Sequence, residues 1–204
     1  GLVPACNPFF EGCVSISRAA RHELPNHVFR ALMLPAAVLQ ALVWLLQARA
    51  LSLSGGAALR RSAAALSVLA VVAGVALVLY GSFLGTEGAT YRFLRRYGTV
   101  AYFGGTCLAM LLTGRALQRL HALGALHLPH THERALLALF TAIVLLGLGN
   151  ALAGLWADEP LRDRVENATE WWGALGLMLA FVVLADLWRR WGLRGAISLD
   201  ARGG

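Results

Sequence analysis

Four histidines gather in one short segment, LHALGALHLPHTHERALL, which connects two apolar stretches of the sequence. Imidazole is a common ligand of zinc and copper, and His127, His130 and His132 form a His-x-x-His-x-His pattern. Glu133, next in the chain, can ligate a metal or orient a ligand. Pro129 breaks any helix here, however, and the spacing matches no closed metal site. The segment therefore fits two interpretations, a metal site and a solvated turn.

Two further residues that could take part in binding or catalysis are Arg30 and Glu170, at the starts of the first and last apolar stretches. Ionisable side chains at membrane depth are costly, and they usually pair with one another or face a cavity. If the two stretches are neighbouring helices, Arg30 and Glu170 can form an ion pair. Arg30 can alternatively bind a lipid headgroup, because a guanidinium matches phosphate oxygens bidentately. A third interpretation leaves both charges in interfacial water.

The composition indicates that membrane-spanning elements position these residues. The chain has 204 residues, is 58% hydrophobic, has only 14% charged residues and has a mean hydropathy of +0.62. These values lie outside the usual range for soluble domains. The net charge of +7 comes from arginines in short clusters beside apolar runs, which is typical of membrane orientation signals. Nucleic acid is therefore not an expected partner.

Five apolar stretches are long enough to cross a hydrocarbon core of about 30 Å as helices. Leu, Ala and Val dominate them, and no alternating strand pattern occurs. The sequence therefore predicts an all-α fold, with residues 1–204 forming a single transmembrane domain built as a polytopic helical bundle. The predicted spans are residues 28–48, 63–84, 97–117, 135–157 and 168–188, with an extracytoplasmic loop over 1–27 and a cytoplasmic tail over 189–204.

The arginines predict the orientation of the bundle, because they accumulate on the cytoplasmic side. The first and third linkers and the tail are rich in Arg, whereas residues 158–167 contain four acidic residues against two arginines. The second linker, residues 85–96, disagrees with this pattern, because it contains Arg92, Arg95 and Arg96. Alternation still places the opening segment outside. A residue bias towards Ala, Leu, Gly and Arg points to a bacterial source, so we expect a bacterial inner membrane and a periplasmic opening loop.

This orientation bears on the cysteines and on the amino terminus. Cys6 and Cys13 lie in an oxidising compartment and are predicted to form a disulfide, with two free thiols as the alternative. Cys107 lies inside a span and is expected to be a buried thiol. A translocated amino terminus without a visible signal predicts that a further helix or a cleaved signal precedes Gly1. A further helix would give six spans.

The order of features resembles the Frag, DRAM and Sfk family of small polytopic membrane proteins. Three groups of residues in the opening segment are similar to the family's outer loop: Pro8, Phe9 and Phe10, then Ser15, Ile16 and Ser17, then Pro25, Val28, Phe29 and Arg30. The last span opens with Glu170, Trp171 and Trp172, as in the family. The resemblance implies six transmembrane helices and a function connected with lipids, because eukaryotic relatives are linked to GPI-anchor remodelling, membrane-lipid organisation and autophagy control.

Small residues recur at helical spacing in GLGNALAG, where Gly147, Ala151 and Gly154 are predicted to let helices approach closely. Asn150 in the same stretch can add an interhelical hydrogen bond. This pattern predicts packing within the bundle or against a partner and does not distinguish the two. Near the end of the last span, Asp186 precedes two arginines by three and four residues, which predicts a local ion pair.

These features favour a non-enzymatic integral membrane protein that interacts with membrane lipids or serves as an accessory subunit of a larger membrane complex. The alternative is a lipid-remodelling enzyme with a site at the outer face around Arg30 and Glu170. No motif that pairs a nucleophile with a base occurs, and no cofactor is expected. A transporter is disfavoured because no span carries a line of ionisable residues.

Overall fold

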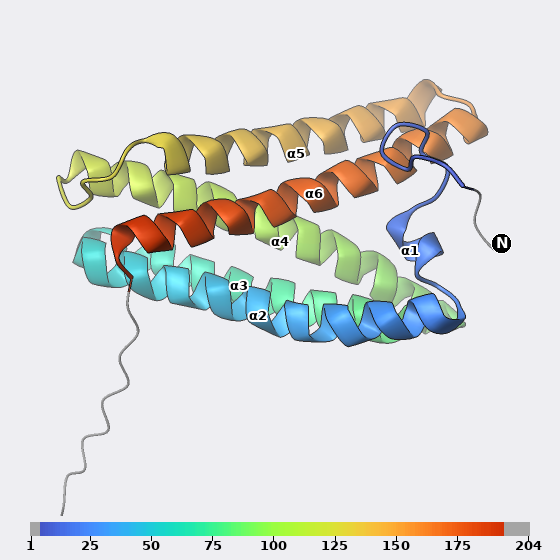
Figure 1. Cartoon of the computed structure of the whole chain (residues 1–204), viewed down its shortest axis with the longest axis horizontal. Helices are drawn as coiled ribbons and strands as arrows, with labels where there is room; N and C mark the ends of the chain where they lie inside the picture. The colour runs from blue at the N-terminus through green and yellow to red at the C-terminus, as the bar shows by residue number, and fades with distance from the viewer. Residues whose placement is uncertain (1–4, 194–204) are drawn as a thin grey trace, which may run out of the picture.

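The computed structural model describes residues 5–193, which form a bundle of long helices (Figure 1). No strand occurs in this range, so the predicted all-α bundle is confirmed. Five of the helices, α2 to α6, are long and apolar enough to cross a membrane. The elements in chain order are α1 (Ile16–Ala19), α2 (Glu23–Gly55), the 3-10 turn η1 (Gly56–Ala58), α3 (Arg60–Phe83), α4 (Ala89–Ala122), α5 (Thr131–Trp156) and α6 (Glu159–Trp191).

The long helices extend beyond the predicted spans. α4 has 34 residues and α6 has 33, which gives each a length of about 50 Å against a hydrocarbon core of about 30 Å. Hydropathy marks only the part of a helix that fits the core, whereas its polar turns continue beyond it. Residues 23–27, expected in the opening loop, therefore begin α2, and residues 89–96, expected in a linker, begin α4. Residues 189–191 of the expected tail continue α6, and 194–204 lie outside the described residues.

Local signals in the sequence set the ends of α6. The Asp158 side chain caps its first turn by accepting a hydrogen bond from the Leu161 N–H at 3.2 Å. Pro160 occupies the first turn, where a missing N–H costs nothing. Gly192 ends the helix in the left-handed conformation, at φ 68°. Because this start fixes the phase of the helix, Glu166 and Glu170 lie one turn apart on the same face.

Helix packing depends on glycines at close approaches. α3 packs along α2 and α4, while α5 packs along α6 and α4. A Cβ built at Gly98 of α4 would lie 2.9 Å from the backbone oxygen of Ala76 in α3. A Cβ at Gly176 of α6 would lie 3.0 Å from the Ile143 side chain of α5. Membrane helices are expected to approach each other closely at small residues, and these contacts are of that kind.

The small residues predicted for packing lie elsewhere. Gly147, Ala151 and Gly154 are exposed, and a Cβ at either glycine would meet nothing within 4 Å. α5 instead buries His132, Glu133, Leu136 and Ala153. The bundle therefore makes no use of this stripe, because α5 lies at its edge and contacts α4 and α6 with a different face. Packing of the stripe against a partner stays a prediction.

The bundle has two ends, between which consecutive long helices alternate in direction (Figure 1). We call one the disulfide end; it contains residues 5–30, 84–100 and 150–173. The other is the histidine end, which contains residues 118–134 and 183–193.

Candidate functional site at the disulfide end

The opening loop is closed by a disulfide and docked on α6. Cys6 and Cys13 are bonded, which confirms the predicted disulfide, and Cys107 is a buried free thiol as expected. The loop stacks the Phe9 ring against α6, with ring centroids 5.6 Å from Trp171 and 5.3 Å from Trp172. Three α6 side chains also donate to carbonyl oxygens of the loop: Asn167 to Gly12 at 2.8 Å, Trp171 to Val14 at 2.9 Å and Trp172 to Phe9 at 3.0 Å. The loop is therefore held in place over the bundle.

A second set of contacts caps the carboxyl end of α3. Arg30 of α2 donates from Nη2 to the Leu84 carbonyl oxygen at 2.7 Å, and Asn26 donates to the same oxygen at 3.1 Å. Arg95 of α4 donates from Nη1 to the Phe83 carbonyl at 3.0 Å and to the Thr86 carbonyl. Helix carboxyl ends present unpaired carbonyls and partial negative charge, which cations stabilise. Arg30 and Arg95 thus stabilise the fold, because their guanidinium groups bind backbone carbonyls at the end of α3.

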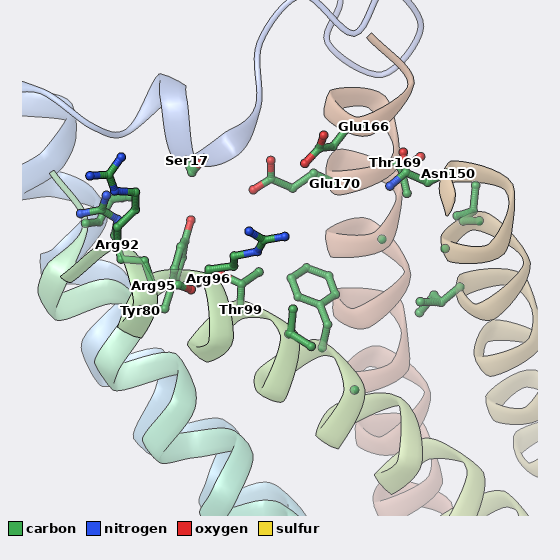
Figure 2. Close-up of a pocket in the computed structure, with 18 of the residues that line it drawn as sticks. Ser17, Tyr80, Arg92, Arg95, Arg96, Thr99, Asn150, Glu166, Thr169 and Glu170 are labelled. Atoms are coloured by element: carbon green, nitrogen blue, oxygen red, sulfur yellow. Dashed lines mark hydrogen bonds between the residues drawn. The ribbon is translucent and has the colours of Figure 1, made fainter. Parts of the chain in front are cut away.

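Below the loop lies a cavity of about 830 Å³ (Figure 2). Its lining includes Ser17 of α1, Arg21 just after that helix and Leu84 just after α3, and residues of α3, α4, α5 and α6 supply the rest. The wall deeper in the bundle is apolar and includes Phe103, Ile143 and Leu146. The lining also includes Val100, Gly104 and Gly147, which are exposed, so the cavity reaches the surface between α4 and α5.

Charged residues occupy the mouth of the cavity. Arg92, Arg95 and Arg96 come from the first turns of α4, while Glu166 and Glu170 come from α6. Figure 2 shows Arg96 and Glu170 reaching towards the same space from opposite walls. Neither Arg92 nor Arg96 forms an ion pair within residues 5–193. The site thus offers guanidinium groups without acidic partners, among them those of Arg92 and Arg96, above an apolar wall.

The structure separates the residues that the sequence predicted as a charge pair. Arg30 binds the Leu84 carbonyl and is not part of the cavity lining. Glu170 lines the cavity, and its carboxylate faces the backbone amides of Ile16 and Ser17. Asn150 also lines the cavity. Its predicted interhelical hydrogen bond stays a prediction.

Sequence reasoning missed Arg92 and Arg96 as site residues. It treated them as a discordant orientation signal in a linker, because hydropathy does not continue the helix through residues 89–96. A signal was nevertheless present, since arginines spaced by three and four residues lie on one helical face.

At the histidine end, the predicted ligands His127, His130 and His132 do not come together. His132 contacts Asp186 of α6, with Nε2 to Oδ2 at 2.9 Å. His130 lies instead beside His121 and Glu133, and His127 lines an adjacent hollow. Asp186 also accepts from Arg189 at 2.9 Å and from Arg190 at 2.6 Å, which confirms the predicted local pairs.

The fold is that of a polytopic membrane-protein bundle, with five helices long and apolar enough to span and a polar cavity at one end. No family model matches the chain, and comparison with curated proteins and with solved structures finds no match either.

Proposed function

We propose that this integral membrane protein binds a phospholipid in the cavity at the disulfide end, without chemical turnover. The main support for this proposal is that Arg92 and Arg96 have no acidic partner within the described residues. Both lie above an apolar wall of the cavity. Guanidinium groups match phosphate oxygens bidentately, and apolar side chains suit an acyl chain. The volume of about 830 Å³ falls in the range of ligand pockets, about 300–1,000 Å³.

The opposite wall favours a particular headgroup. Glu166 and Glu170 face the arginines across the cavity and can accept hydrogen bonds from a protonated amine. Phosphatidylethanolamine carries such an amine beside its phosphate, whereas the quaternary ammonium of phosphatidylcholine has no N–H to donate. We therefore infer a preference for phosphatidylethanolamine. The lipid would enter between α4 and α5, where Val100, Gly104 and Gly147 are exposed.

We further infer that the disulfide end is extracytoplasmic, in the periplasm of a bacterial inner membrane. The Cys6–Cys13 bond supports this orientation, because disulfides persist in oxidising compartments. Membership of the Frag, DRAM and Sfk family remains part of the proposal. It is supported by the contact of Phe9 with Trp171 and Trp172, since these residues belong to the two segments that carry the resemblance.

A second candidate function is that of an accessory subunit. The exposed stripe of Gly147, Ala151 and Gly154 on α5 favours it, because small residues let another membrane helix approach closely. This function predicts that the protein co-purifies with a larger complex from its native membrane in mild detergent. A Gly154→Leu variant, which lies in the stripe but not in the cavity lining, should then lose the partner while the bundle itself stays folded.

Lipid binding is tested by native mass spectrometry of the full chain released from vesicles of phosphatidylethanolamine and phosphatidylcholine. We expect bound phosphatidylethanolamine in the wild type, and about a 10-fold or greater loss in the Arg92→Gln/Arg96→Gln double variant, because charge-assisted hydrogen bonds are lost. The matched control is Arg60→Gln/Arg61→Gln, which removes two exposed arginines at the other end of α3.

Equal lipid retention by the double variant and the control would overturn the proposal. The same vesicles also test the enzymatic alternative, which predicts that their lipids change chemically with the wild type and remain unchanged with Glu170→Gln. Binding without turnover predicts identical lipid composition in both samples.

A further inference from the structure

Two imidazoles and one carboxylate converge at the histidine end. His121 lies near the end of α4, His130 immediately precedes α5, and Glu133 lies in the first turn of α5. His121 Nδ1 is 2.6 Å from Glu133 Oε2, and His130 Nδ1 is 2.7 Å from Glu133 Oε1. One nitrogen or oxygen of each residue lies within 4.8 Å of the others. Both carboxylate oxygens thus face ring nitrogens.

The hydrogen bond on the far side of His121 decides what its Nδ1 can do. His121 Nε2 lies 2.8 Å from the Leu128 carbonyl oxygen, which can only accept, so Nε2 carries a proton. In the neutral imidazole, Nδ1 then presents a lone pair to a carboxylate oxygen at 2.6 Å. Two acceptor atoms at this distance need a proton or a metal ion between them.

A single metal ion can satisfy the whole cluster. The ring centroids of His121 and His130 are 4.1 Å apart, and one ligand atom from each ring and from Glu133 lies within 4.8 Å of the others. In its Nε2–H tautomer, His130 likewise presents a lone pair at Nδ1, so one divalent ion can be ligated by both lone pairs. The contact from His121 Nε2 to the Leu128 carbonyl is also the outer contact that orients metal-binding histidines.

We propose that His121 Nδ1, His130 Nδ1 and one carboxylate oxygen of Glu133 bind a divalent transition-metal ion, for which Zn²⁺ is the best match. Two histidines and a glutamate form a known zinc ligand set that leaves a fourth position open. Tetrahedral zinc places its ligand atoms about 3.3 Å apart. The present contacts of 2.6 and 2.7 Å run to different oxygens of Glu133. One ligand atom of each residue lies within 4.8 Å of the others, so the distances between ligand atoms need to change by about 1.5 Å or less.

The surroundings allow the ion to enter and complete its coordination. The cluster borders a hollow of about 580 Å³, which has room for water as the fourth ligand. Gln118 and His127 also line this hollow. The side chains of His121 and Glu133 are only 10% and 6% exposed, whereas His130 is 55% exposed. The ligand set is thus held by the fold on one side and open to solvent on the other.

The site differs from the pattern that the sequence suggested. Of His127, His130 and His132, only His130 belongs to it, because His132 turns towards Asp186. His121 joins from the preceding helix because the chain turns back at Gly124, which has φ +66°. An ion bound at this site would link the end of α4 to the start of α5.

The test uses metal-free full-length protein in detergent and Zn²⁺ alone as the probe. We expect one Zn²⁺ per chain by competition with a chromogenic chelator. X-ray absorption should show nitrogen and oxygen ligands at about 2.0–2.1 Å with imidazole scattering. Zn²⁺ should also raise the Tm, because it binds the folded state. His130→Asn should weaken affinity about 10-fold or more, and Glu133→Gln, which keeps an amide oxygen for hydrogen bonding, should weaken it as well.

The matched control is the His22→Asn/His27→Asn double variant, since both of these histidines are exposed at the disulfide end. It should keep wild-type Zn²⁺ affinity and the same Tm increase. The Tm increase on adding Zn²⁺ is measured against each variant's own metal-free Tm, so a general loss of stability does not obscure the result. The proposal is overturned if Zn²⁺ does not bind, or if binding is unchanged in His130→Asn and Glu133→Gln. Either result would leave the cluster as hydrogen bonds between two helix ends.

Discussion

Asn167 of α6 donates a hydrogen bond from Nδ2 to the carbonyl oxygen of Gly12, at a distance of 2.8 Å. Asn167 is buried, so this bond replaces water on both partners. It fixes the disulfide-closed loop at the point where α6 runs past the cavity mouth. The same stretch of α6 therefore holds the loop in position and sets the helix face on which Glu166 and Glu170 lie.

Gly12 should not tolerate a side chain. It has φ +58°, and a Cβ built there would lie 2.0 Å from the backbone oxygen of Arg164. Gly12→Ala should therefore lift the loop from α6 and break the bond to Asn167. We expect a lower Tm and faster proteolysis within the opening loop, both measured on purified protein in detergent.

Gly56→Ala separates backbone strain from steric conflict. Gly56 has φ +51°, yet a Cβ there would meet nothing within 4 Å. Its conformation, φ 51° with ψ −132°, is one that glycine adopts far more readily than alanine, so strain of about 1–3 kcal/mol should lower the Tm by about 2–4 °C per kcal/mol. Gly12→Ala should cost more than this. Equal shifts in the two variants would show that the loop does not press on α6.

Arginines at the disulfide end should divide into structural and ligand-binding groups. Arg30→Gln removes the bond to the Leu84 carbonyl, and loss of such a charged hydrogen bond costs about 1.5–3 kcal/mol. Its Tm should fall while phosphatidylethanolamine binding stays near the wild-type level. Arg96→Gln should show the opposite pattern, with weaker binding and little change in Tm. If Arg30→Gln instead weakened phosphatidylethanolamine binding without changing the Tm, Arg30 would be a ligand of the lipid headgroup.

The sequence predicted the elements because their causes are local. Runs of Leu, Ala and Val long enough to cross a bilayer specify helices whatever their neighbours are. The Cys6–Cys13 bond and the pairs between Asp186 and the following arginines also join residues close in sequence. Each of these features could be recognised without knowing how the helices pack.

The partners of Arg30 and the composition of the cavity could not be predicted in the same way. Arg30 binds a backbone carbonyl 54 residues away, and a carbonyl has no signature in the sequence. The ligand cluster at the histidine end likewise depends on how the chain turns between α4 and α5. His121 lies twelve residues before Glu133, a separation that matches no short motif.

Two glycines should respond differently to the same substitution. A Cβ at Gly98 would lie 2.9 Å from the backbone oxygen of Ala76, which cannot move without shifting α3. Gly98→Ala should therefore lower the Tm. Gly147→Ala should leave the Tm of the isolated protein unchanged or slightly higher, because a Cβ there meets nothing and alanine favours the helix by about 1 kcal/mol over glycine. A matching fall for Gly147→Ala would place a neighbouring helix against this face of α5.

Asp186 should stabilise the contact between α5 and α6 at the histidine end. Its Oδ2 lies 2.9 Å from Nε2 of His132 in α5, and within α6 its carboxylate pairs with Arg189 and Arg190. Asp186→Asn removes the charge that these three groups share. We expect a lower Tm than in Asp163→Asn, which makes the same change at an exposed site of α6 that forms no ion pair within residues 5–193.

Salt should separate the contributions to this effect. The side chains of Arg189 and Arg190 are 77% and 52% exposed, so high ionic strength should screen their share. His132 is only 8% exposed, and its contact with Asp186 should persist. The Tm difference between wild type and Asp186→Asn should therefore shrink between low and high salt without vanishing. Complete loss at high salt would mean that only the surface arginines matter, and that the contact with His132 contributes nothing to joining the helices.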